Sequence, residues 1–167
     1  LAVDWDTFSL AAAKSILNDK PVWFAADVCK DFDPYRSLLS TEAYDYESIL
    51  GTSLGVPKKE SIRTRISEPS HAMALVGVDL RDDDPNQVRK WKVENSWGEC
   101  GQDDPGYLMM TQEWFQRYGF EVVVDLGLLD EETQQAYLKY ECDPIYLPYN
   151  DPFGAVARQC SGCRSHE

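Results

Sequence analysis

The sequence predicts an α+β fold in which an antiparallel sheet is flanked by helices. Four segments after residue 70 have the lengths and apolar patterns of strands, and turn residues separate them. Segments with helical patterns lie before and after these strands. The chain has 167 residues, enough for one domain with a hydrophobic core, and its hydrophobic content of 43% argues against disorder.

The N-terminal region predicts one helix followed by one strand. Residues Asp6–Lys20 have a roughly helical apolar period, with Thr7 as the expected N-cap, and Pro21 ends the helix. The segment Pro21–Val28 (PVWFAADV) forms a continuous apolar run, which is typical of a strand buried on both faces.

The segment Lys30–Pro69 is mostly polar and rich in turn residues, so we expect loops with short helical pieces around Tyr44–Leu50. It also carries a basic cluster that stands out in an acidic chain: Lys58, Lys59, Arg63 and Arg65. The favoured interpretation of this basic cluster is a solvated face. The alternative is pairing with acidic neighbours in an assembly.

Four more strands and two helices are predicted after this segment. The strands are expected at His71–Leu80, Lys90–Asn95, Tyr107–Met110 and Phe120–Asp125. The helices are expected at Gln112–Tyr118, with Thr111 as N-cap, and at Glu131–Tyr140, capped by Asp130. From Cys142 onward the chain is rich in proline and is expected to be extended.

Composition and charge exclude several classes of function. The formal net charge is −13, so the chain repels phosphate backbones and anionic lipid head groups and is a poor nucleic-acid or membrane binder. No apolar run approaches the ~20 residues that span a bilayer. The chain begins at Leu1 without the pattern of a signal peptide, and we interpret it as a piece of a longer chain.

The cysteines favour a reducing compartment. Their number is odd, their spacing is irregular, and the sequence has no Asn-x-Ser/Thr sequon. Both features are typical of intracellular proteins, and we expect a cytoplasmic location. The five residues are Cys29, Cys100, Cys142, Cys160 and Cys163.

His71 and Asn95 are the candidate catalytic residues. His71 opens a strand, and taken alone a satisfied structural histidine is the more common interpretation. Asn95 ends a strand that can pair with the His71 strand in antiparallel orientation, and this changes the balance. A thiolate nucleophile needs a base that is oriented by a third group.

The neutral amide of Asn95 suits this orienting role. Its oxygen can accept a hydrogen bond from one nitrogen of the His71 ring and fix the tautomer. It does so without a negative charge that would compete with the thiolate for the imidazolium. Trp97 follows closely in the sequence, and we expect it to lie over this hydrogen bond and exclude water.

These motifs resemble the papain superfamily, and more closely the bleomycin hydrolase and aminopeptidase C group of cysteine peptidases. The matching segments are SHAMALVGVD, WKVENSWGE, GYLMMTQEWF, FEVVVD, KPVWFAADV and DPIYLPYNDPFGAVA. The resemblance covers about Trp5 to Ala157. It implies a papain-like fold with a half-barrel sheet, as the C-terminal fragment of a larger catalytic domain. Residues 1–157 are then this fragment, with a C-terminal arm at 141–157, and residues 158–167 are an extra tail.

The resemblance also implies a role for each candidate residue. His71 is the general base and imidazolium partner, Asn95 orients it, and Trp97 shields the pair. The family's nucleophilic cysteine opens a helix well before this segment, after a glutamine of the oxyanion hole, and neither has a counterpart here. Cys29 and Cys100 match no catalytic position. The implied reaction is acyl transfer through an acyl-enzyme, and it needs no metal and no organic cofactor.

Partners follow from the same resemblance. The substrates are peptides with a free N-terminus, and the complete protein is a homohexamer whose active sites face an internal channel. In the family the C-terminal arm lies in the active-site cleft. The extra residues Arg158–Glu167 would therefore have to be trimmed or displaced, or they would block the cleft.

Two other interpretations stay open. The chain contains no nucleophile, so alone it is expected to be inactive, and the alternative function is a catalytically inactive papain-like binding or assembly module. The tail motif Cys160-Ser-Gly-Cys163 with His166 is a weak candidate for zinc binding or redox chemistry. It offers only three ligands, whereas a structural zinc site has four. We expect no metal site.

Overall fold

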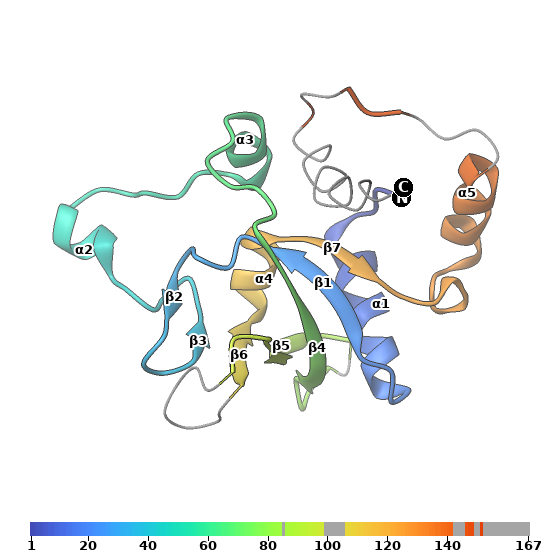
Figure 1. Ribbon diagram of the computed structural model, residues 1–167, viewed down its shortest axis with the longest axis horizontal. Coiled ribbons are helices and arrows are strands. Elements are labelled where there is room, and N and C mark those ends of the chain that lie inside the picture. Colours follow the sequence, from blue (N-terminus) through green and yellow to red (C-terminus); the bar gives the residue numbers. More distant parts are fainter. Residues whose placement is uncertain (85, 99–105, 142–145, 149–150, 152–167) are drawn as a thin grey trace, which may run out of the picture.

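In a computed structural model, the described part of the protein is built around one seven-stranded sheet with flanking helices (Figure 1). The described residues are 1–84, 86–98, 106–141, 146–148 and 151. The strand order is β2-β3-β6-β5-β4-β1-β7. The strands are β1 Val22–Ala26, β2 Phe32–Asp33, β3 Leu38–Leu39, β4 His71–Leu80, β5 Val88–Glu94, β6 Tyr107–Thr111 and β7 Gly119–Val123.

The predicted α+β class is confirmed. The helices are α1 Trp5–Leu17, α2 Tyr46–Leu50, α3 Lys58–Arg63, α4 Gln112–Tyr118 and α5 Glu131–Glu141, and a 3-10 turn lies at Leu126–Leu128. The sheet is antiparallel, as expected, except that β3 pairs with β6 in parallel orientation. The other paired strands are antiparallel.

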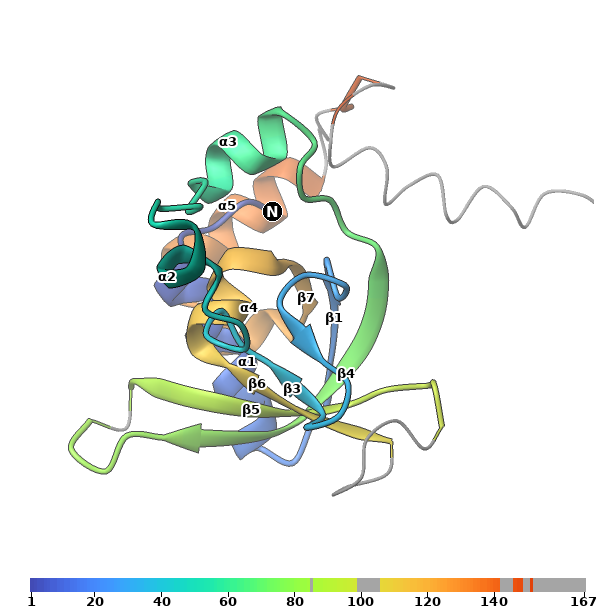
Figure 2. The same ribbon diagram turned by 90° about the vertical axis from the view of Figure 1, so that its left-hand side faces the viewer.

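The sheet curves around α1 and α4, and these two helices fill its concave side (Figure 2). Phe115 of α4 lies at the centre of this core. Its ring centroid lies 5.4 Å from the centroids of four other aromatic rings, those of Trp5, Phe8, Phe24 and Trp91. Aromatic side chains bury large areas and prefer such tilted arrangements. The core therefore joins both helices to the central strands and fixes the curvature of the sheet.

The predicted first helix is present, but its ends differ. Thr7 is not the N-cap: the carboxylate of Asp4 caps α1, and it accepts hydrogen bonds from both the backbone N–H and the hydroxyl of Thr7. An aspartate before the first turn satisfies a free helix N–H and interacts favourably with the helix dipole. The helix ends at Leu17, before the expected Lys20, because Asn18 caps it and Asp19 adopts a positive φ of 58°.

The strand at Pro21–Val28 is present as β1, but it is not buried on both faces. Val22, Phe24 and Ala26 are fully buried against the helices, whereas Trp23 is 43% exposed on the opposite face. Trp23 is paired with the exposed Val123 of β7. A hydrophobic run alone does not distinguish a strand with one covered face from a strand with two.

The polar segment Lys30–Pro69 contains more structure than its sequence predicts. The helical piece at α2 is confirmed, and β2, β3 and α3 are additional. The strands β2 and β3 have two residues each, too few for a periodic pattern to be recognised.

The basic cluster is not uniformly a solvated face. Lys58 is partly buried, and its Nζ donates hydrogen bonds to the carbonyl oxygens of Gln116 and Gly119 at the C-terminal end of α4. The ammonium also lies 5.9 Å from the ring centroid of Trp5 and 5.5 Å from that of Phe120. Burial lowers the pKa of Lys58 to about 8. Lys59, Arg63 and Arg65 are exposed, as expected.

The predicted elements after residue 70 are present, and no end differs from the expected one by more than two residues. Thr111 is confirmed as the N-cap of α4, because its hydroxyl accepts a hydrogen bond from the N–H of Trp114 at 3.2 Å. Asp130 accepts hydrogen bonds from both the N–H and the hydroxyl of Thr133, as expected for a cap of α5. The tail 158–167, with its cysteine motif, lies outside the described residues, as does most of the arm 142–157. Among the described residues, no helix is long and apolar enough to cross a bilayer.

Candidate active site

His71 and Asn95 come together because of the register between β4 and β5. These strands pair antiparallel with Ala74 opposite Glu94 and Leu75 opposite Val93. Asn95 directly follows β5. Its side chain therefore points to the same face of the sheet as the buried Val93, two residues earlier. Residues two positions apart on a strand point to the same face, so His71 and Asn95 are diagonal neighbours at one end of the sheet.

The His71 ring and the Asn95 carboxamide form a hydrogen bond. His71 Nε2 lies 2.9 Å from Asn95 Oδ1. An amide oxygen can only accept, so Nε2 carries the proton and donates it. The neutral ring then presents Nδ1 as its basic nitrogen, and among the described residues Nδ1 has no hydrogen-bond partner. The arrangement leaves one ring nitrogen available to take a proton from a reacting group.

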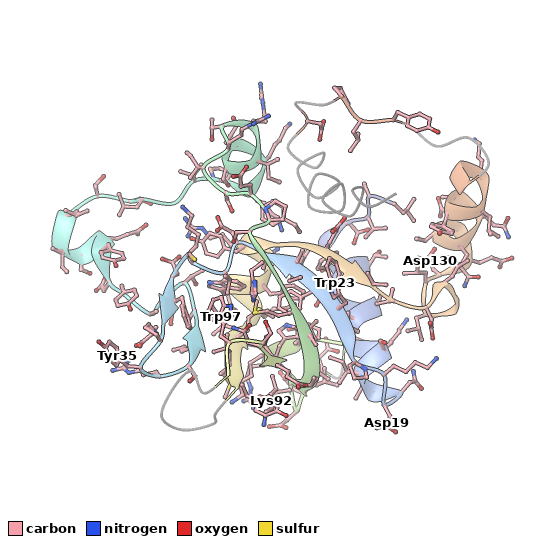
Figure 3. The ribbon with its side chains drawn as sticks, viewed as in Figure 1. Asp19, Trp23, Tyr35, Lys92, Trp97 and Asp130 are labelled. Carbon is pink, nitrogen blue, oxygen red and sulfur yellow. The ribbon has the colours of Figure 1, made fainter. Side chains whose placement is uncertain are left out.

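Trp97 covers this pair from one side. Its ring centroid lies 4.8 Å from that of His71, with an angle of 30° between the planes, and 6.1 Å from that of Phe32 in β2. Trp97 lies between the β2–β3 hairpin and β4 (Figure 3). Asn95 is only 7% exposed, whereas Trp97 is 42% exposed. The indole therefore separates a buried hydrogen bond from solvent, and a bond in such a low-dielectric environment is stronger than in water.

The backbone around Asn95 is fixed by its neighbours. Asn95 N–H donates to the carbonyl of Gly106 at 2.9 Å, at the start of β6. Gly98 and Gly106 have φ values of 73° and 84°, which side chains other than glycine rarely adopt. Asn95 Nδ2 is buried and has no hydrogen-bond partner among the described residues. Only the oxygen of the carboxamide is thus engaged, with the histidine.

Among the described residues, no thiol is bonded to this pair. Cys29 is exposed in the turn after β1, and its thiol has no hydrogen bond with the described residues. Cys100 and the three later cysteines lie outside the described residues. Within the described ranges, no group of three or more histidine, cysteine or acidic side chains could hold a metal ion.

Two cavities lie away from these residues. One, of about 710 Å³, lies between α1 and the ends of β4 and β5, and its lining includes Asp6, Arg81 and Gln112. The other, of about 450 Å³, lies on the outer face of β4, β5 and β6, around Gly77 and Met109. Neither is lined by the histidine, the asparagine or the shielding tryptophan. The chemistry of the side chains, and not a cavity, identifies the site.

Sequence reasoning missed two parts of the surroundings. Phe32 supports Trp97 from a two-residue strand that lies in a segment expected to be loop. Asp27, at the end of β1, is buried and accepts hydrogen bonds from Ser67 and Ser70. The signal for Asp27 was present in the sequence, because an acidic residue within an apolar run needs a polar partner when it is buried.

Comparison with known proteins assigns a family. A profile of the Peptidase C1-like family matches residues 1–154. Bleomycin hydrolase from Homo sapiens is 40% identical over 153 residues, which cover 91% of this chain and 33% of that protein. Aminopeptidase C from Lactococcus lactis subsp. cremoris is 39% identical over 159 residues, which cover 94% of this chain and 35% of that protein.

A solved structure agrees with this assignment. The crystal structure of PepW from Lactobacillus rhamnosis HN001 matches with a TM-score of 0.84 and 35% identity, over 91% of this chain and 33% of that one. The chain thus spans about a third of the length of the curated relatives it matches, in their C-terminal part. The 167-residue chain therefore belongs to the Peptidase C1-like family, in the group of the papain-like peptidases bleomycin hydrolase and aminopeptidase C.

Proposed function

We propose that the complete protein is a cysteine aminopeptidase that hydrolyses peptide and amide bonds through a Cys-His-Asn triad. This chain supplies His71 and Asn95, and the cysteine lies outside it. The observation that carries the proposal is the 2.9 Å hydrogen bond between His71 Nε2 and Asn95 Oδ1 beneath Trp97. It fixes the ring so that Nδ1 is free for a thiol.

The proposed reaction has two halves. His71 Nδ1 takes the proton of the thiol, and the thiolate attacks the substrate carbonyl carbon. The imidazolium then gives this proton to the departing amine, and an acyl-enzyme thioester forms. In the second half His71 takes a proton from water, the hydroxide attacks the thioester, and the carboxylic acid leaves as the thiolate is restored. Asn95 accepts from Nε2 throughout, which keeps the ring oriented in both protonation states.

The substrates, assembly and location are proposals too. Relatives named aminopeptidase C and aminopeptidase E support substrates with a free N-terminus. We propose a homohexamer with its sites facing an internal channel, and a cytoplasmic location. Light scattering on the complete protein and localisation of a tagged form test these two points, and a monomer or a secreted protein would contradict them.

A catalytically inactive binding or assembly module is the second candidate. The observation that favours it is the absence of a thiol bonded to His71 among the described residues. The exposed pair of Trp23 and Val123 on the outer face of the sheet would suit such a module.

An activity assay separates the two candidates. The complete protein is expected to cleave aminoacyl fluorogenic substrates, and both alkylation of thiols and H71A are expected to abolish turnover. A complete protein without any turnover would support the inactive module. The 167-residue chain alone is expected to give no thiol-dependent turnover. Turnover by the chain that an alkylating agent abolishes would contradict the triad and point to Cys29 or Cys100.

A further inference from the structure

Asp27 is a buried carboxylate next to the histidine strand. It directly follows β1 and is only 7% exposed. Its Oδ2 accepts a hydrogen bond from Ser67 Oγ at 3.0 Å. Its Oδ1 lies 3.4 Å from Ser70 Oγ, a hydroxyl that shares its proton with the carbonyl oxygen of Ala26 at the same distance. Among the described residues, Asp27 has no cationic partner. The serine hydroxyls are therefore its side-chain partners, and a buried polar group depends on such hydrogen bonds.

The two serines enclose the segment that leads into His71. Ser70 directly precedes His71, and its N–H donates to the carbonyl of Ala26 at 3.1 Å. Ala26 is in turn the strand partner of His71 in the pairing of β1 with β4. Ser67 is itself buried, and its N–H donates to the carbonyl of Ser61 in α3. The carboxylate thus fixes both ends of residues 67–70 against the end of β1.

The backbone of Asp27 connects this segment to the core. Its N–H donates to the carbonyl of Tyr118 at the end of α4, at 3.0 Å. Tyr118 and its neighbour Trp114 are buried in the core, and the Tyr118 hydroxyl donates to Asp31 at 2.6 Å. Asp27 therefore joins the segment before His71 to a rigid helix. A side chain that holds a catalytic group needs such support, because a shift of about 1 Å can cost a factor of about one hundred in rate.

We propose that Asp27 is a positioning residue for His71: its hydrogen bonds with Ser67 and Ser70 hold the start of β4 so that the imidazole meets Asn95. The inference rests on the proposed function for its catalytic meaning, but the positioning itself is a property of this chain. The carboxylate acts through its hydrogen bonds, so an amide at the same place should serve nearly as well.

The His71 ring can be observed directly by NMR. The chain has only two histidines, so H166N leaves His71 as the single imidazole. In that background, the ¹⁵N shifts of the ring report its tautomer, and exchange of the Nε2 proton with water reports the bond to Asn95. We expect D27A to speed this exchange about tenfold and to mix the tautomers. D27N should stay within twofold of the background, because it can accept from one serine and donate to the other.

Matched serine variants keep the test informative if D27A does not fold. S67A removes the shorter hydrogen bond to Asp27, whereas S15A removes an equally buried hydroxyl that binds the carbonyl of Lys20. We expect S67A to speed the exchange several-fold and S15A to leave it unchanged. Exchange in D27A or S67A equal to the background would overturn the proposal, as would D27N as fast as D27A.

Kinetics on the complete protein test the catalytic consequence. D27A should lower kcat about tenfold with KM within twofold, and D27N should restore kcat. A wild-type protein without peptidase activity would refute the proposed function and leave the NMR result standing. An active protein with unchanged kcat in D27A would instead refute the positioning role.

Discussion

The ring of Trp97 lies 4.8 Å from the ring of His71, at an angle of 30°, above the hydrogen bond that joins His71 to Asn95. The tryptophan follows Asn95 by two residues, so the short segment after β5 contains both the amide and its cover. Phe32 contacts the indole and holds it from the edge of the sheet. Because Asn95 and Trp97 are only two residues apart, the same short stretch of backbone positions both side chains.

Removal of the cover should weaken the orientation of the base. In the complete protein, W97A is expected to lower kcat about tenfold, because water then competes for Nε2–H and for the Asn95 oxygen. W97F keeps part of the apolar cover and should lie between W97A and wild type. The matched control is W23A, since Trp23 is 43% exposed and Trp97 42%, but Trp23 lies on the outer face of β1 (Figure 3). Equal kcat values for W97A and W23A would contradict the shielding role.

Replacement of Asn95 tests why the orienting group is neutral. N95A removes the acceptor of Nε2–H and should lower kcat at least tenfold. N95D keeps an acceptor but adds a charge that favours the imidazolium, so the alkaline limb of kcat/KM should move to higher pH. The pH profiles of the three proteins measure both effects. An N95D profile that moves to lower pH would refute the assigned role of the carboxamide.

The parts of the fold that depend on local pattern were predictable from the sequence. The period-2 pattern before Asn95 and the apolar run after His71 predict two strands that can pair, and their register then brings the two side chains together. The Thr111 cap is likewise a local feature. The residues of the candidate site lie in or next to such segments, which makes their positions predictable from the sequence.

Features that depend on distant contacts were not predictable in this way. The parallel pairing of Leu38 with Met109 joins residues 71 positions apart. The strand β3 has only two residues, too few for its sequence to predict which strand it pairs with. Lysines usually lie on the surface. Lys58 is partly buried because its Nζ donates hydrogen bonds to carbonyls at the end of α4. Trp23 shows the converse, because it is an apolar strand residue that is 43% exposed.

Gly119, the first residue of β7, is required by close packing against α4. A Cβ atom at this position would lie 2.5 Å from Cδ2 of Phe115 and 2.7 Å from its carbonyl oxygen. Phe115 is fully buried at the centre of the aromatic core and cannot move away. G119A is therefore expected to lower the free energy of unfolding by roughly 1–3 kcal/mol in urea denaturation. G127A is the matched control, because no atom lies within 4 Å of its Cβ position, and an equal loss in both variants would contradict this explanation.

Lys58 should make stability depend on pH in the alkaline range. Burial lowers its pKa in the folded chain to about 8, from an ordinary value of 10.5. Between these two values the unfolded chain binds more protons than the folded chain, so the contribution of Lys58 to stability rises with pH. The full rise is on the order of 3 kcal/mol. Below about pH 8 both states are protonated, and the contribution is constant.

The measurement compares urea denaturation of wild type and K58M at pH 7 and pH 10. Because other groups also titrate in this range, the informative quantity is the difference between the two proteins. Wild type should gain free energy of unfolding relative to K58M as the pH rises, since methionine has no proton to lose. K59M, in which the neighbouring exposed lysine is replaced, should follow wild type. A difference between wild type and K58M that stays constant, or that falls with pH, would show that burial does not lower the pKa of Lys58 in the folded chain.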